Sequence, residues 1–153
     1  MKNAVLFKFI ITAIIGVLAL GCNQRQTSLH SFNNNSWAAK DSVVFYFNIL
    51  DSTKINNLSF FFRNTIEYPY RNIFLITTLS HKSNAIQADT AEYLIADKYG
   101  KWLGVGFGKN RDNYFVFNEQ IIFKNTGDYK LTIRHGMRQE NLTGVSKLGL
   151  KVK

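Results

Sequence analysis

One residue type in this chain is both scarce and reactive: the single cysteine, Cys22. A lone thiol can form neither an internal disulfide nor a cysteine-cluster metal site. Cys22 directly follows the small residue Gly21, and the chain turns from apolar to polar at this point. A small residue before a cut and a nucleophilic sulfur after it are what leader removal and thioether formation require. The pair therefore indicates processing and acylation rather than catalysis.

The apolar run before Cys22 extends from Phe9 to Leu20, and Lys2 and Lys8 lie on its N-terminal side. A run of this length is typical of a secretory signal, whereas a spanning helix needs about 20 apolar residues. The stretch ALGC (19–22) resembles a bacterial lipobox. We expect residues 1–21 to be a lipoprotein signal peptide, cleaved after Gly21, and Cys22 to carry a diacylglycerol and an N-acyl lipid. An ordinary signal peptide with a coincidental cysteine is the alternative.

The three histidines, His30, His81 and His135, show no metal-ligand spacing. No HExxH pattern is present, and no two of them stand four residues apart. We therefore predict no metal site, and we expect His81 and His135 to lie at turns or strand ends.

A glycine-rich segment, GKWLGVGFGKNRDN (100–113), is the part of the chain most similar to a phosphate-binding loop. A phosphate loop needs glycine at position 103 and serine or threonine at 110, where this chain has Leu103 and Asn110. The segment is better interpreted as a long hairpin-like connection between strands. Two places for Trp102 stay open, a buried plug and an exposed contact. Gly104 and Gly106 could mark a close backbone approach.

The carboxylates Asp89, Glu92, Asp97 and Asp112 are too scattered in the sequence to assign an acid–base pair, and no GxSxG motif is present. We predict that the chain is not an enzyme and that it has no cofactor beyond the lipid on Cys22. The formal charge is +9, and the loss of Lys2 and Lys8 with the signal lowers it to +7. Because the cations outside the closing KLGLKVK (147–153) stand singly, nucleic acid is not the expected partner, and anionic glycans or lipid headgroups fit better.

Seven short runs after Trp37 are rich in β-branched and aromatic residues and are separated by turn residues. They cover residues 41–50, 56–64, 72–80, 89–97, 113–123, 128–136 and 144–153. Alternation of Tyr129, Leu131 and Ile133 with polar neighbours is typical of a half-buried strand. The last run, with Lys147 and Lys151, suits a sheet edge.

These runs predict an all-β fold, an antiparallel β-sandwich of about seven or eight strands with immunoglobulin-like connections. We expect the sandwich to occupy residues 37–153 and residues 22–36 to form the lipidated cysteine and a flexible polar tether. A glycine turn just before Tyr129 resembles a tyrosine corner, in which the phenol bonds back to nearby backbone.

Several segments in order resemble the GldH family of gliding-motility lipoproteins. They are KDS (40–42), RNTIEYPYRNIFL (63–75), DTAEYLIAD (89–97), GKWLGVGFG (100–108) and HGMRQENLTGVSKLGLKV (135–152). Ile95 stands where the family often has leucine. The resemblance implies a Bacteroidota source, a lipid-anchored envelope protein and a role in surface gliding. It implies no catalytic residue and no settled ligand.

We therefore expect a non-enzymatic accessory of the gliding or associated secretion machinery that binds other envelope proteins. A carbohydrate-binding sandwich lipoprotein is the alternative, and a hydrolase with an unrecognised site ranks last. By resemblance, the absence of an acidic cluster after Cys22 favours the outer membrane, facing the periplasm. The candidate contact residues are Tyr68, Tyr70, Trp102, Arg111 and Arg138.

Overall fold

The structure is a computed structural model, and it describes residues 25–153. The predicted signal peptide, the cleavage after Gly21 and the lipidation of Cys22 lie outside the described residues. Within the described chain, no helix is long and apolar enough to cross a membrane.

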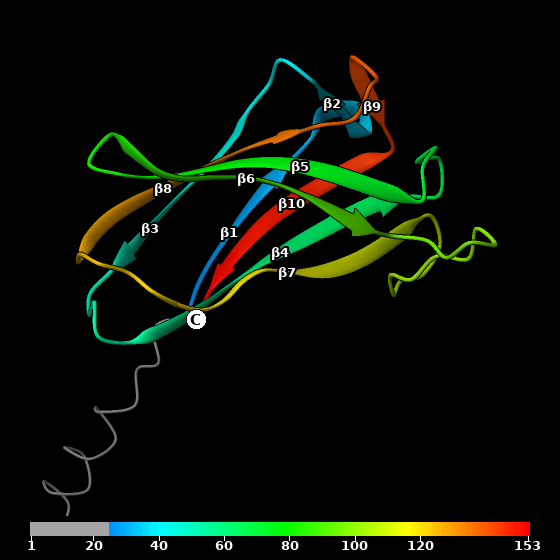
Figure 1. Cartoon of the computed structure of the whole chain (residues 1–153). Coiled ribbons are helices and arrows are strands. Elements are labelled where there is room, and N and C mark those ends of the chain that lie inside the picture. The colour runs from blue at the N-terminus through cyan, green and yellow to red at the C-terminus, as the bar shows by residue number, and fades with distance from the viewer. Residues whose placement is uncertain (1–24) are drawn as a thin grey trace, which may run out of the picture.

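Two four-stranded antiparallel sheets face each other, with a short two-stranded sheet at one end (Figure 1). The first has the order β1-β10-β4-β7 and the second the order β3-β8-β5-β6, while β2 pairs with β9. The strands are β1 (Gln26–Ser31), β2 (Ser36–Ala38), β3 (Val43–Ile49), β4 (Ile55–Thr65), β5 (Asn72–His81), β6 (Asn84–Leu94), β7 (Asn110–Ile122), β8 (Gly127–His135), β9 (Asn141–Thr143) and β10 (Val145–Val152). A 3-10 turn, η1, covers Asn33–Asn35.

The core lies between the two large sheets and follows from the two-residue period of the strands. In β3, for example, Val43, Phe45, Phe47 and Ile49 are buried while Val44 and Tyr46 are exposed. Aromatic rings fill much of the space, and the ring of Phe47 stacks on that of Tyr129 with 5.7 Å between centroids. All seven predicted strands are present, and the all-β sandwich is confirmed.

The strand order differs from the immunoglobulin-like connections that we expected. Without the short β2 and β9, consecutive long strands lie in opposite sheets, except for β5 and β6, which pair with each other, and the last strand, β10, lies beside the first, β1. This is the connectivity of a jelly roll. The predicted tyrosine corner is nevertheless formed, because the Tyr129 hydroxyl donates a 2.8 Å hydrogen bond to the Asn125 carbonyl.

The expected tether is wrong for most of its length. Residues 26–31 form β1, which pairs with β10 from Gln26 opposite Val152 to Ser31 opposite Lys147. A polar segment can do this because backbone groups make the ladder and an edge strand needs little apolar surface. The Gln26 side chain adds two hydrogen bonds to the backbone of Asn48, 2.6 and 2.9 Å long, which join β1 to β3 across the sheets. The folded domain thus begins near Gln26 rather than at Trp37.

The expectation that the last strand forms an edge is also wrong. β10 lies inside its sheet between β1 and β4. Its lysines fit there because Lys147 and Lys151 point to the outer face, while Leu148, Leu150 and Val152 point into the core. The prediction placed β10 at the edge because it did not include β1, which is the actual edge strand beside it.

His135 ends β8 in the core, where its ring packs edge-on to Trp37. Its Nε2 lies 3.1 Å from the Trp37 carbonyl, and its Nδ1 is buried without a partner. Burial lowers the pKa of His135 from its usual 6.5. The strand-end position predicted for this histidine is confirmed, and so is the one predicted for His81, which closes β5.

The buried imidazole makes stability depend on pH. As the pH falls below 6.5, the unfolded chain binds a proton at this histidine more readily than the folded chain, so folding stability is lost. We expect the melting temperature to fall when the pH is lowered from about 7.5 to about 5.5, and to fall less in His135→Gln than in the wild type. Thermal scans by circular dichroism at the two pH values measure both declines. Equal declines in the two proteins would contradict this origin.

Candidate partner-binding site at the tip

The connection from β6 to β7, residues 95–109, projects from one end of the sandwich (Figure 1). We call this segment the tip loop and this end of the molecule the tip. The backbone is ordered by two antiparallel bridges, Ala96 with Trp102 and Val105 with Asp112. Val105 and Asp112 exchange both backbone hydrogen bonds, at 3.0 and 2.7 Å. The predicted hairpin-like connection is therefore confirmed.

Two glycines let the tip loop fold back against β7. A Cβ at Gly104 would lie 2.6 Å from the Asn113 side-chain oxygen, and one at Gly106 would collide with the Asn110 carbonyl. The close backbone approach that we expected at both positions is confirmed. A larger residue at either one would push the loop off the strand.

Two acids at the tip, Asp97 and Asp112, accept internal hydrogen bonds. The Asp97 carboxylate accepts the backbone N–H groups of Tyr99 and Lys101 at 2.8 and 3.0 Å. Asp112 accepts two hydrogen bonds from the Arg63 guanidinium, at 2.6 and 2.7 Å. This pairing lowers the pKa of Asp112 and raises that of Arg63, chiefly through the hydrogen bonds between them. Both carboxylates therefore shape the loop rather than face a ligand.

Beneath the ion pair, two buried amides fix the start of β7. The Asn113 amide donates to the Asn64 side-chain oxygen at 2.9 Å, and the Asn64 amide donates to the Thr65 carbonyl at 2.9 Å. Both residues are buried. Satisfied amides of this kind hold neighbouring strands in one register. The tip loop is thus carried on a rigid support.

The side chains that the tip loop presents are apolar and exposed. Phe107 is 99% exposed, Tyr99 83%, Val105 68% and Leu103 55%. Beside them is a hollow of about 310 Å³, lined in part by Leu94, Leu103, Val105 and Tyr114. An ordered loop that holds several apolar side chains in water is typical of an interaction surface.

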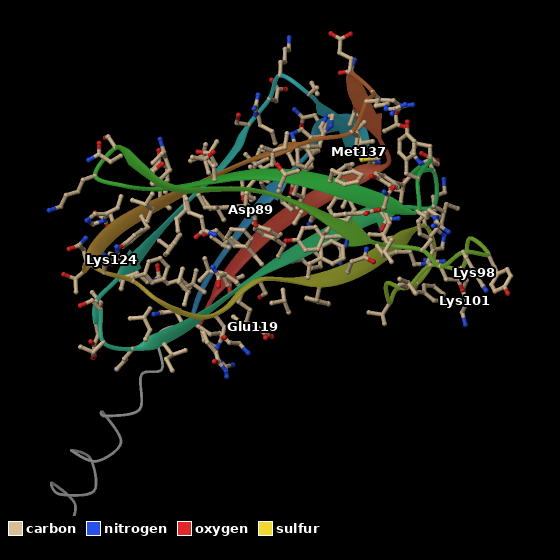
Figure 2. All side chains as sticks on the ribbon, viewed as in Figure 1. Asp89, Lys98, Lys101, Glu119, Lys124 and Met137 are labelled. Carbon is tan, nitrogen blue, oxygen red and sulfur yellow. The ribbon has the colours of Figure 1, made fainter. Side chains whose placement is uncertain are left out.

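Cations surround this apolar surface. Figure 2 shows Lys98 and Lys101 on the projecting loop, and Lys109 follows in the same segment. The Lys98 ammonium lies 5.0 Å from the centre of the Tyr99 ring. The loop contains these three lysines and one acid, Asp97, so its formal charge is positive. A complementary partner would present an apolar patch with an acidic rim.

Of the candidate contact residues, the tyrosines of the YPY segment (68–70) serve packing. Tyr68 is buried, and its hydroxyl donates to the Asn72 carbonyl at 2.9 Å. Burial raises the pKa of this phenol. Tyr70 is half-buried and meets the Tyr68 ring edge-on. Tyr68 therefore does not belong to the exposed surface.

The other three candidates differ in exposure. Trp102 is half-buried and packs against the core in the tip loop. Its exposure is therefore intermediate between the two alternatives, a buried plug and an exposed contact. The Arg111 guanidinium donates to the carbonyls of Gly108 and Asn110, at 2.8 and 2.7 Å, and so closes the loop. Arg138 is exposed in the connection from β8 to β9.

Sequence reasoning missed Tyr99, Leu103, Val105 and Phe107. The signal was present, because apolar residues alternate with glycines from Leu103 to Gly108. A segment that turns so sharply cannot bury every second side chain on a sheet. Apolar residues in such a segment are exposed unless another element covers them.

The remaining histidine and carboxylate side chains of the described chain do not form a cluster. His81 contacts the Asp128 carbonyl through Nδ1 at 3.2 Å, and Glu92 accepts the Asn72 amide at 2.6 Å. Within residues 25–153, no three His, Cys, Asp or Glu side chains are placed to hold a metal ion.

Fold and site together define the class: a jelly-roll domain with an ordered loop that exposes apolar side chains at one end. Comparisons with known proteins are more specific. Residues 24–152 match the family model described as GldH lipoprotein. The "Gliding motility lipoprotein GldH homolog" of Christiangramia forsetii is 30% identical over 153 residues, covering 95% of this chain and 93% of that protein. The "Gliding motility lipoprotein GldH" of Flavobacterium johnsoniae is 31% identical over 150 residues, covering 93% of each.

The chain belongs to the GldH lipoprotein family. The resemblance noted in the sequence is confirmed, and with it a membrane-anchored lipoprotein of the cell envelope. Among solved structures, the infectious bursal disease virus VP2 subviral particle aligns with a TM-score of 0.39 at 11% identity, over 85% of this chain and 32% of that one. A score this low adds nothing to the assignment.

Proposed function

We propose that the chain is a non-enzymatic accessory of the gliding machinery and its associated secretion apparatus, acting through protein–protein contacts made by the tip. The observation that carries this proposal is the exposure of Tyr99, Val105 and Phe107 on a hydrogen-bonded loop. An ordered loop loses little entropy on binding, so its apolar side chains contribute more fully to affinity. The family relatives carry gliding motility in their names.

The proposed location is the outer membrane, facing the periplasm, with the lipid on Cys22 as anchor. No acidic residue occurs in the sequence before Asp41, so no acidic cluster follows the cysteine. β1 begins four residues after Cys22, and the tip lies at the far end of β4 and β7. A protein anchored in this way would present the tip loop away from its own attachment point.

Removal of the tip side chains tests the proposal. We expect the pair Val105→Ser and Phe107→Ser, placed in the chromosomal gene, to abolish colony spreading while the protein stays at normal level in the membrane fraction. Full burial of an aliphatic or aromatic side chain contributes about 1.5–3 kcal/mol, so loss of two weakens binding by a factor on the order of 100 or more.

The matched control is Val44→Ser with Tyr46→Ser, an exposed apolar pair on the outer face of β3. Cells with this pair should spread like the wild type. Normal spreading of the tip variant, measured beside a gene deletion that does not spread, would show that the tip makes no essential contact.

A further inference from the structure

The end of the sandwich opposite the tip, which we call the base, lies close to the expected lipid. β1 begins and β10 ends here, side by side (Figure 1). Arg25, the first described residue, follows Cys22 by three positions in the sequence. Three residues of extended chain span at most about 10 Å. The base would therefore lie at the membrane surface once Cys22 is acylated.

A cluster of cations lies at this end of the molecule. Thr27 is paired with Lys151 in the ladder, which places Arg25, Lys151 and Lys153 on one face of neighbouring strands. Repulsion from Lys151 and Arg25 lowers the pKa of Lys153. The two ion pairs of the described chain, Lys54 with Asp51 and Arg63 with Asp112, include none of the three. The cluster therefore lacks an anionic partner among residues 25–153.

Apolar side chains accompany these cations. A hollow of about 270 Å³ at the base is lined in part by Leu50, Lys54, Ile55 and Lys153. Leu50 is 69% exposed and Ile55 59%. The acid at this hollow, Asp51, is bonded to the Thr53 hydroxyl and backbone N–H at 2.6 and 2.9 Å. The base thus combines unpaired cations with exposed aliphatic side chains.

We propose that the base is a second membrane contact, in which Arg25, Lys151 and Lys153 bind anionic lipid headgroups and Leu50 and Ile55 enter the headgroup layer. The proposal rests on the lipid anchor of the proposed function. Such a contact would fix the direction in which the tip points, because a single lipidated residue leaves the domain free to tilt.

Continuity with the anchor favours a bilayer over a protein as the occupant. The cluster lies within a few residues of the predicted acylation site, so the headgroups are the first anionic surface that it meets. Juxtamembrane cations each strengthen binding to anionic membranes by about fivefold, and aliphatic side chains add to this.

The test uses the mature chain with Cys22→Ser, which lacks the lipid but retains the whole described core. Its binding is measured by sedimentation with phosphatidylcholine vesicles, with and without phosphatidylglycerol. The base variant carries Arg25→Gln, Lys151→Gln and Lys153→Gln. A control at the tip, with Lys98→Gln, Lys101→Gln and Lys109→Gln, makes the same change in net charge. Circular dichroism verifies that all three proteins are folded.

We expect the parent and the tip control to bind the phosphatidylglycerol vesicles, and the base variant to bind on the order of a hundredfold more weakly. Three outcomes would overturn the proposal: equal losses in the two variants, binding that does not require phosphatidylglycerol, and no binding by the parent chain. None of these outcomes bears on whether Cys22 is acylated or on colony spreading, so the anchor and the tip are tested separately.

Discussion

Cells producing the full chain with Cys22→Ser are expected to show no palmitate label on this protein. Serine lacks the sulfur that forms the thioether, and the signal peptidase that acts on lipoproteins requires the acylated cysteine. The variant therefore keeps residues 1–21, whereas in the wild type the acyl chains supply the attachment, at about 0.8 kcal/mol for each buried methylene. The measurement is metabolic labelling with radioactive palmitate, followed by fractionation of the envelope.

The control for this experiment is Gly21→Ala, which keeps a small residue before the cut and should be labelled like the wild type. Persistent label on Cys22→Ser would place the lipid on another residue and would refute our interpretation of the ALGC stretch.

The largest effect on folding is expected from Trp37→Ala. The Trp37 ring is buried, stacks on Phe32 at 4.9 Å and meets His135 edge-on at 5.3 Å. Its indole N–H donates to the Asp41 carbonyl at 3.0 Å. Replacement of a buried tryptophan by alanine costs about 3–5 kcal/mol, a large part of the stability of a small domain. Urea unfolding followed by circular dichroism measures the loss.

Trp102→Ala is the matched control, since it removes the other tryptophan of the chain. Because Trp102 is half-buried, its replacement is expected to cost only about 1–1.5 kcal/mol. A loss for Trp37→Ala as small as the one expected for Trp102→Ala would mean that the N-terminal segment around β2 is not part of the cooperative fold. The same result would contradict the extension of the sandwich to residues before Trp37.

The sequence was most informative where one side chain in two is buried. β3 and β8 alternate between buried positions and outward-facing ones, and their extents were predicted to within a few residues. The same principle failed at β1, where neither face needs apolar residues because the strand lies at an edge and is held by backbone bonds and by Gln26. β2 and β9 have three residues each, too few for a period to be recognised.

The order of the strands in the two sheets could not be predicted from local sequence patterns, for a different reason. Tyr129 forms a tyrosine corner in a jelly roll as it would in an immunoglobulin-like sandwich, so this local signal does not distinguish the two topologies. Which strand lies beside which depends on long-range pairing such as β10 between β1 and β4.

At the tip, the local sequence predicted the role of the glycines but not which side chains the loop exposes. The sequence predicted a close backbone approach at Gly104 and Gly106, and in the structure Asn113 lies next to the first and Asn110 next to the second. Tyr68 stood out as an aromatic beside a proline, yet it fills a place in the core. Exposure is a property of the assembled loop, and so Phe107 was recognised only in three dimensions.

The pairing of β1 with β10 determines how the molecule responds to traction. A pull between a partner at the tip and an anchor on Cys22 runs parallel to the strands. Antiparallel ladder bonds are perpendicular to the strands, so such a pull strains the bonds of all six paired residues of β1 at once instead of opening them one by one. Sliding all of these bonds together needs far more force than peeling a strand from its end. The accessory role that we propose would thus be combined with an attachment point that does not unravel under load.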